Sequence, residues 1–149
     1  EATAEAPRDA DAFAVLGVLH NLSRDYAEAE AAFAEAVRLR PADASLWNKL
    51  GATCANAGRA DRALSHYVRA LELQPNHVRA LTNLGIAYGN LPGRELDGAA
   101  CFLRALELHP GAAHVWAYVG NVLHAAGRDD LAARARAMDV EAFRGQLNF

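Results

Sequence analysis

Six polar side chains at related positions of the sequence could bind an extended peptide at its main chain and its end. They are the amides Asn48, Asn56, Asn83 and Asn90 and the cations Lys49 and Arg79. An amide offers a carbonyl acceptor and an NH2 donor, so it can pair with the C=O and N–H groups of a peptide without reading its side chains. The two cations could hold a carboxylate, such as the free end of a chain.

No group of residues has the spacing of a catalytic or metal-binding site. The six histidines are scattered, and His20, His66 and His124 fall on different parts of the chain without a carboxylate at metal-binding spacing. The sequence has no phosphate-binding loop, no nucleophile elbow and no cysteine with a supporting base. We therefore expect a protein that is not an enzyme, with no metal, no cofactor and no small-molecule substrate.

Composition narrows the class of partner further. The 149 residues carry a formal net charge of −3, so no basic face is indicated and nucleic acid is not expected to bind. Cys54 and Cys101 lie far apart inside apolar helical patterns, which favours small buried packing residues over a disulfide or a metal site. The uncharged run from 110 to 127 contains polar and helix-breaking residues, so we interpret it as an amphipathic helix.

The elements that position the six polar residues follow from an internal repeat of 34 residues, with one extra residue in its third copy. The shared positions are a Leu-Gly pair, a later aromatic residue and a final proline. They recur at Leu16, Gly17, Phe33 and Pro41, at Leu50, Gly51, Tyr67 and Pro75, and at Leu84, Gly85, Phe102 and Pro110. A fourth copy opens with Trp116, Val119 and Gly120 and then loses the aromatic residue.

This pattern resembles the tetratricopeptide repeat, a helical hairpin that stacks on its neighbours because it cannot bury its apolar face alone. We expect an all-α fold of antiparallel helix pairs that form a right-handed superhelix with a concave inner surface. The expected divisions are a flexible lead-in at 1–9, repeats at 10–43, 44–77 and 78–112, and a degenerate repeat with a short C-terminal helical bundle at 113–149.

Helical periodicity separates the core side of each first helix from its open side. Positions four, seven, eight and eleven cluster on the core side, and positions two, six, nine and thirteen lie about 180° away. In the second and third repeats the open positions are Ser45, Lys49, Ala52 and Asn56, then Arg79, Asn83, Ile86 and Asn90. Asn48 is expected at the edge of this stripe, and Ala52 leaves space for a ligand side chain. The alternative is that these polar residues are simply solvated, although asparagine is a mediocre helix former.

The other two repeats differ at the same positions. The first has the largely apolar stripe Asp11, Val15, Val18 and Leu22, which forms either a wall for a ligand side chain or a surface that packs on something outside this chain. The fourth has His114, Tyr118, Asn121 and Ala125, which are not expected to contact a ligand.

Three strings carry a closer resemblance: LGVLHNLSRDY from 16 to 26, LWNKLGATCAN from 46 to 56, and NHVRALTNLGIAYGN from 76 to 90. They resemble the last three repeats of the receptor family for the type-1 peroxisomal targeting signal, which recognises cargo ending in Ser-Lys-Leu or a close variant. The tail from His114 onward is similar to the terminal helical bundle of plant and algal members.

The resemblance implies a role for each matching residue. Asn48, Asn56, Asn83 and Asn90 match the asparagines that bond the signal backbone, Lys49 and Arg79 match the cations near its carboxylate, and Ala52 matches a small residue beside the pocket for the terminal Leu. It also implies a cytoplasmic receptor that cycles to the peroxisomal membrane. Further cargo-binding repeats, and the motifs that contact peroxisomal docking proteins, would then precede residue 1.

Three other interpretations stay open. A chaperone-tail adaptor would grip an acidic C-terminal peptide with several cations, whereas this stripe has one Lys and one Arg. The repeat region of a glycosyltransferase would place one Asn at a fixed position, which Asn83 satisfies but Lys49, Val15 and Tyr118 do not. A purely structural scaffold would show no peptide selectivity.

Overall fold

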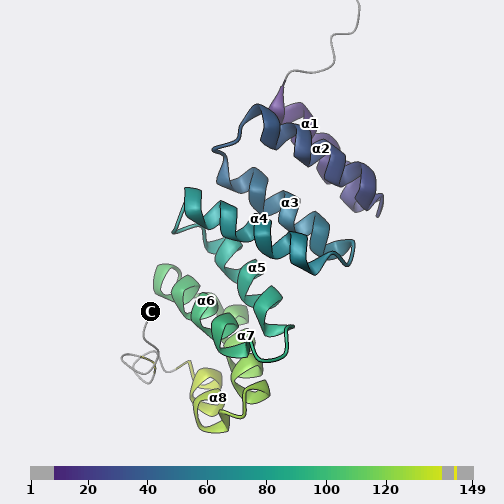
Figure 1. The fold of residues 1–149 in the computed structure, drawn as a ribbon. Helices are drawn as coiled ribbons and strands as arrows, with labels where there is room; N and C mark the ends of the chain where they lie inside the picture. Colours follow the sequence, from purple (N-terminus) through teal and green to yellow (C-terminus); the bar gives the residue numbers. More distant parts are fainter. Residues whose placement is uncertain (1–8, 139–142, 144–149) are drawn as a thin grey trace, which may run out of the picture. The chain divides into compact units, whose positions relative to one another are not determined.

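The computed structural model describes residues 9–138 and 143, and every regular element in those ranges is helical. Eight helices follow one another along the chain (Figure 1): α1 Ala10–Leu22, α2 Tyr26–Leu39, α3 Ala44–Asn56, α4 Ala60–Leu73, α5 Val78–Gly89, α6 Glu95–Leu108, α7 Ala113–Ala125 and α8 Asp129–Arg136. The prediction of an all-α fold is confirmed. No helix of the described chain is long and apolar enough to cross a membrane.

Local residues explain where the helices begin and turn. The Asp43 carboxylate accepts hydrogen bonds from the backbone N–H groups of Ser45 (3.0 Å) and Leu46 (3.3 Å), and so caps the start of α3. Between α3 and α4, Gly58 has a φ of 77°, in the left-handed region that glycine adopts without strain. Gly127 has a φ of 73° in the equivalent turn between α7 and α8.

The repeated glycine and aromatic residue pack directly on each other inside three of the helix pairs. A Cβ atom added to Gly51 would lie 2.7 Å from Cε1 of Tyr67, and one added to Gly85 would lie 2.6 Å from Cε1 of Phe102. The same contact joins Gly17 to Phe33. Because glycine has no Cβ atom, the backbone of the first helix lies closer to the aromatic ring of the second helix than any other residue type would allow. In the fourth pair, the nearest atom to Gly120 is Cγ of Arg136, at 3.5 Å.

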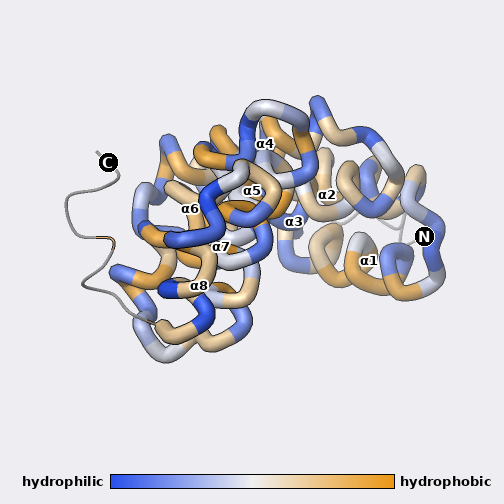
Figure 2. The backbone as a smooth tube through the Cα atoms, turned by 90° about the horizontal axis from the view of Figure 1, so that it is seen from below, coloured by the Kyte–Doolittle hydropathy of each residue, from blue (hydrophilic) through white to orange (hydrophobic). Residues whose placement is uncertain are grey.

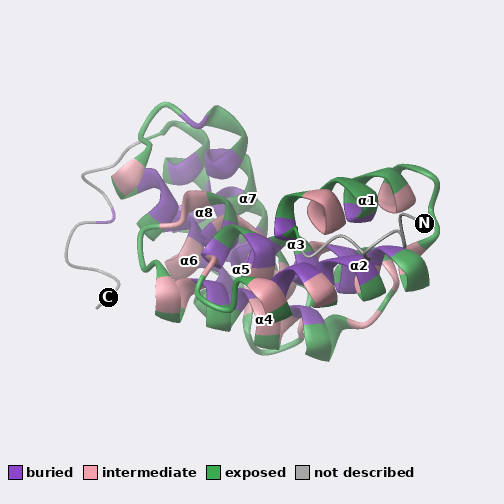
Figure 3. Cartoon of the chain, turned by 90° about the horizontal axis from the view of Figure 1, so that it is seen from above, coloured by how far each residue is buried: buried purple, intermediate pink, exposed green. Residues whose placement is uncertain are grey.

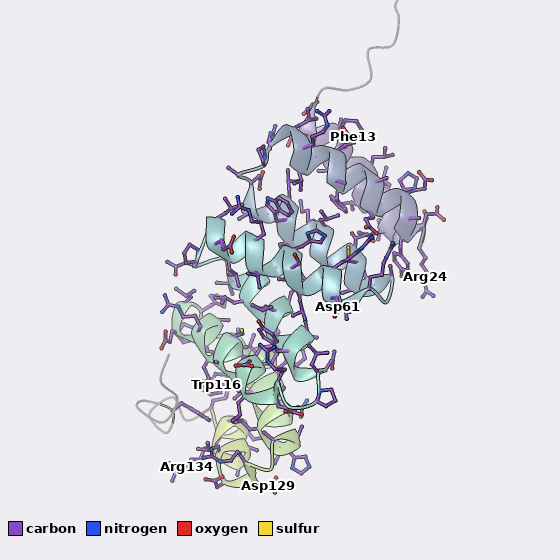
Figure 4. All side chains as sticks on the ribbon, viewed as in Figure 1. Phe13, Arg24, Asp61, Trp116, Asp129 and Arg134 are labelled. Atoms are coloured by element: carbon purple, nitrogen blue, oxygen red, sulfur yellow. The ribbon has the colours of Figure 1, made fainter. Side chains whose placement is uncertain are left out.

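The chain divides into two compact units, which we call unit 1 (residues 1–77) and unit 2 (residues 78–149). In unit 1, α1 packs on α2, α2 on α3 and α3 on α4. The core of this unit joins Phe33 and Val37 of α2 to Leu46 and Leu50 of α3. Phe13, labelled in Figure 4, packs against this cluster from α1.

In unit 2, α5 packs on α6, α6 on α7 and α7 on α8. Phe102 of α6 is fully buried, as are Val115, Val119 and Leu123 of α7. Trp116, labelled in Figure 4, is also buried on α7, and its ring centroid lies 5.9 Å from that of Phe143. Apart from Phe143, the predicted C-terminal bundle past residue 138 lies outside the described residues, as do residues 1–8 of the predicted lead-in. The division into four repeat units stays a prediction.

The first helix departs from the expected core pattern. Leu16 has the repeat position of Leu50, yet 43% of Leu16 is exposed whereas only 5% of Leu50 is. The physical reason is that a preceding helix pair covers one leucine and not the other. Leu50 packs on α2 of the pair before it, whereas no described helix pair precedes α1. Figure 2 colours much of α1 as hydrophobic, and Figure 3 shows exposed residues along it. Its exposed apolar side chains are Val15, Leu16, Val18, Leu19 and Leu22.

Candidate functional site

The predicted site residues of unit 1 all lie on α3. Lys49 and Asn56 are exposed and Ala52 is half-buried, while Leu50, Gly51 and Cys54 on the other side of the helix are buried. The stripe of positions two, six, nine and thirteen thus faces away from the unit 1 core, as the periodicity predicts.

Asn48 differs from the expectation that it lies at the edge of an exposed stripe. It is 7% exposed and is one of two buried polar residues in the described chain, the other being Thr53. Its side chain or backbone already takes part in an interaction within the protein. Since a buried amide is normally satisfied by the protein itself, Asn48 has less freedom to bind a peptide than Asn56 does.

A buried hydroxyl ties α3 to α1. Thr53 Oγ1 donates to the backbone oxygen of Lys49 at 2.9 Å and accepts a hydrogen bond from Nδ2 of Asn21 at 2.8 Å. Asn21 belongs to α1, so this network fixes the height of α3 along α1. The backbone oxygen of Lys49 accepts a hydrogen bond in this network, while the Lys49 side chain is exposed.

Asp11, a carboxylate whose pKa responds to Lys49, is itself paired with an arginine. Asp11 on α1 is bound by Arg40 through two hydrogen bonds of 2.7 and 3.2 Å. The hydrogen bond and the charge of Arg40 lower the pKa of Asp11, and Lys49 lowers it slightly further. Within residues 9–138 and 143, Lys49 forms no ion pair or side-chain hydrogen bond. Its ammonium group is available to an anionic ligand.

The predicted site residues of unit 2 lie on α5 or directly after it. Arg79 is exposed in the first turn, Asn83 is half-buried one turn later, and Asn90 is exposed just past the end of the helix. Arg79 has no ion pair with any residue that the structure describes. Asn83 already has an interaction within the protein.

A pocket of about 360 Å³ brings Arg79 and Asn83 together with residues from two other elements of unit 2. It is lined by Val78, Arg79, Thr82, Asn83, His109, Ala112, His114 and Val115. Thr82 Oγ1 is turned to its own helix, where it donates to the backbone oxygen of Val78 at 3.0 Å. The pocket therefore combines a cation, an amide and two imidazoles over an apolar base.

Two of these lining residues were not expected to take part. His109 was left out of the predicted site, and His114 was expected not to contact a ligand. His109 follows the end of α6 and His114 lies in the first turn of α7, about 30 residues from Arg79 in sequence. Periodicity within one helix cannot reveal such a grouping, because it depends on which helix ends meet.

A second pocket, of about 290 Å³, lies in unit 1 and was not predicted at all. Glu30 lines it and binds Arg62 at 2.8 Å, and Arg59 lies 2.6 Å from the same carboxylate. His66 also lines this pocket, and its ring centroid is 5.6 Å from that of Trp47. Burial lowers the pKa of His66, with Arg62 lowering it further and Glu30 opposing the shift.

The described residues hold no cluster of His, Cys, Asp and Glu that could bind a metal ion. Cys54 and Cys101 are free thiols. Burial raises the pKa of both, to about 11 for Cys101. A thiol with a raised pKa is a poor nucleophile at neutral pH.

Comparison with known proteins gives two kinds of relative by sequence. Residues 20–144 match the family described as the cilia and flagella-associated protein 70 middle TPR-like domain. The chain is also 34% identical to the peroxisomal targeting signal receptor of Eremothecium gossypii, over 95% of this chain and 27% of the relative. It is 41% identical to the peroxisomal targeting signal 1 receptor of Dictyostelium discoideum, over 95% of this chain and 22% of the relative. The chain thus spans about a quarter of the length of these relatives.

Solved structures resemble the fold at lower sequence identity. MamA matches with a TM-score of 0.82 at 17% identity, over 95% of this chain and 84% of its own. YrrB, described as a TPR protein with an unusual peptide-binding site, matches with a TM-score of 0.77 at 21% identity, over 95% of this chain and 72% of its own. These two matches confirm the tetratricopeptide-type fold.

Proposed function

The chain belongs to the TPR-like family described for the middle domain of cilia and flagella-associated protein 70, and we propose that it is a cargo-binding part of a peroxisomal targeting signal receptor. The relatives named as such receptors support this proposal, because they match nearly the whole chain at 34% and 41% identity. The peptide-binding site named for YrrB shows that a protein of this fold can bind a peptide.

The proposed ligand is the C-terminal end of a cargo protein, in the form Ser-Lys-Leu or a close variant. Lys49 and Arg79 bind the terminal carboxylate, Asn48, Asn56, Asn83 and Asn90 bond the peptide backbone, and Ala52 leaves room for the final Leu. The observation that best supports this role is the unit 2 pocket, where Arg79 and Asn83 meet without an acidic residue in the lining. An unpaired guanidinium beside an amide suits a carboxylate followed by a peptide group.

The proposed role is non-catalytic. The receptor would bind cargo in the cytoplasm and cycle to the peroxisomal membrane, with docking proteins contacted through other parts of the receptor. The affinity of this chain for cargo would then depend on chain-end recognition alone, and an internal Ser-Lys-Leu sequence would not bind because it lacks the terminal charge.

Fluorescence polarisation tests this function with three labelled peptides on the 149-residue chain. The first ends in Ser-Lys-Leu with a free carboxylate, the second is its C-terminal amide, and the third is an acidic C-terminal peptide of the chaperone-tail type. We expect the carboxylate peptide to bind most tightly. Equal binding of the acid and the amide would contradict the carboxylate role, and tighter binding of the acidic tail would favour the adaptor alternative. Absence of binding by the first peptide would contradict cargo binding by this chain on its own.

A further inference from the structure

The unit 2 pocket has a lining that suits an anion. It contains one guanidinium, Arg79, and two imidazoles, His109 and His114, and no carboxylate. An imidazole, like a guanidinium, can donate an N–H hydrogen bond to a carboxylate.

No neighbouring carboxylate enters this lining. On α6, Glu107 lies two residues before His109, but it is bound to Arg104 at 2.8 Å and does not line the pocket. On α7, the ring of His114 meets the uncharged ring of Tyr118 edge-on, with centroids 6.3 Å apart. On α5, Arg79 is the charged residue of the lining and Thr82 and Asn83 are neutral.

The base of the pocket strengthens electrostatic contacts within it. Val115 and Ala112 are buried, and with Val78 they give the cavity an apolar base. Charges interact more strongly beside such a base than in open water. In addition, α5 begins at Val78 and α7 at Ala113, so both helix N-termini lie at the pocket, and no side chain caps the start of α7. Helix N-termini favour an anion.

We propose that His109 and His114 bind the terminal carboxylate of the cargo peptide together with Arg79. This inference rests on the proposed function and adds two specificity residues to it. Each imidazole donates an N–H hydrogen bond to the carboxylate.

The test compares the affinities of the Ser-Lys-Leu peptide and of its C-terminal amide. The ratio of the two affinities isolates the contribution of the carboxylate from that of the rest of the peptide. The variants are His109→Gln with His114→Gln, and the control His124→Gln, which alters an exposed histidine at the far end of α7 that is bonded to Asp129.

We expect the acid-to-amide affinity ratio to fall about threefold or more in the double variant, a modest loss for partly exposed hydrogen bonds to a carboxylate. The ratio should stay unchanged in the His124 control, with circular dichroism confirming an intact fold in each variant. The inference is overturned by an unchanged ratio in the double variant. If the carboxylate peptide fails to bind the unaltered chain, cargo binding by this chain on its own is contradicted together with this inference.

Discussion

Asn83 and Asn48 are both proposed to bind the peptide, but their surroundings in the structure differ. Asn83 lines the unit 2 pocket with Arg79, whereas Asn48 is buried in unit 1. Both asparagines already have an interaction within the protein, but an amide in a pocket lining is within reach of a ligand, whereas a buried amide is not. The contribution of each asparagine to binding should therefore differ.

Asn83→Ala should weaken binding of the Ser-Lys-Leu peptide by about 1–3 kcal/mol, because a peptide group facing the pocket would lose its hydrogen-bond partner. Fluorescence polarisation on both proteins measures the change. The matched control is Asn121→Ala, which alters an exposed asparagine on α7 outside the pocket lining and should leave binding unchanged. A change within error for Asn83→Ala would indicate that Asn83 is a solvated residue that does not contribute to peptide binding.

His66 should make unit 1 less stable in mild acid. Its lowered pKa, caused mainly by burial, means that the unfolded chain takes up the proton first as the pH falls. The stabilising effect of a neutral His66 is therefore present above about pH 6.5, the unfolded value, and is lost as the pH falls below it.

The urea midpoint, measured at pH 7.5 and pH 5.5, tests this prediction. We expect His66→Gln to lose less stability than the unaltered chain between the two values, since glutamine does not titrate. An equal loss in both proteins would show that protonation of His66 does not contribute.

At the scale of the helix pair, one glycine and one aromatic ring set how closely two helices approach. The contact recurs in three pairs and is missing from the fourth, where Arg136 replaces the ring. The same substitution should therefore have opposite effects at equivalent positions of different repeats.

Gly51→Ala should destabilise the chain by about 1–3 kcal/mol, because its Cβ would lie 2.7 Å from the Tyr67 ring and overpacked cores lose stability. Gly120→Ala should be neutral or stabilising by up to about 1 kcal/mol, since its Cβ would make an ordinary 3.5 Å contact and alanine favours the helix. Urea unfolding of the two variants measures the size and sign of each change in the free energy of unfolding. Gly111→Ala serves as a control in open space, and equal losses at positions 51 and 120 would contradict the prediction.

At the scale of the whole molecule, each unit contains two helix pairs and its own part of the proposed site residues. Unit 1 has four of them on α3, and unit 2 has Arg79 and Asn83 on α5 with Asn90 just past the end of that helix. Burial depends on the position of a pair within its unit. Leu50 has a preceding pair to pack on, and Leu16 has none among the described residues.

Leu50→Ala should lower the free energy of unfolding by about 2–5 kcal/mol, the usual cost of a cavity in a core. Leu16→Ala, at the equivalent position of the first repeat, should cost about 1 kcal/mol or less because this side chain is already 43% exposed. Thermal or urea unfolding of the two variants provides the comparison. A similar cost at both positions would mean that α1 is covered in solution.

The amino-acid sequence by itself determined the all-α fold, the recurring glycine and aromatic positions and the open stripe of α3 and α5. These features repeat every 34 residues and depend on neighbours within one hairpin, so local periodicity is sufficient to predict them. Only the tertiary structure decided that Leu16 is exposed, that Asn48 is buried and that His109 and His114 join Arg79. Each of these depends on packing between helices that are distant in sequence, for which a repeat pattern carries no signal.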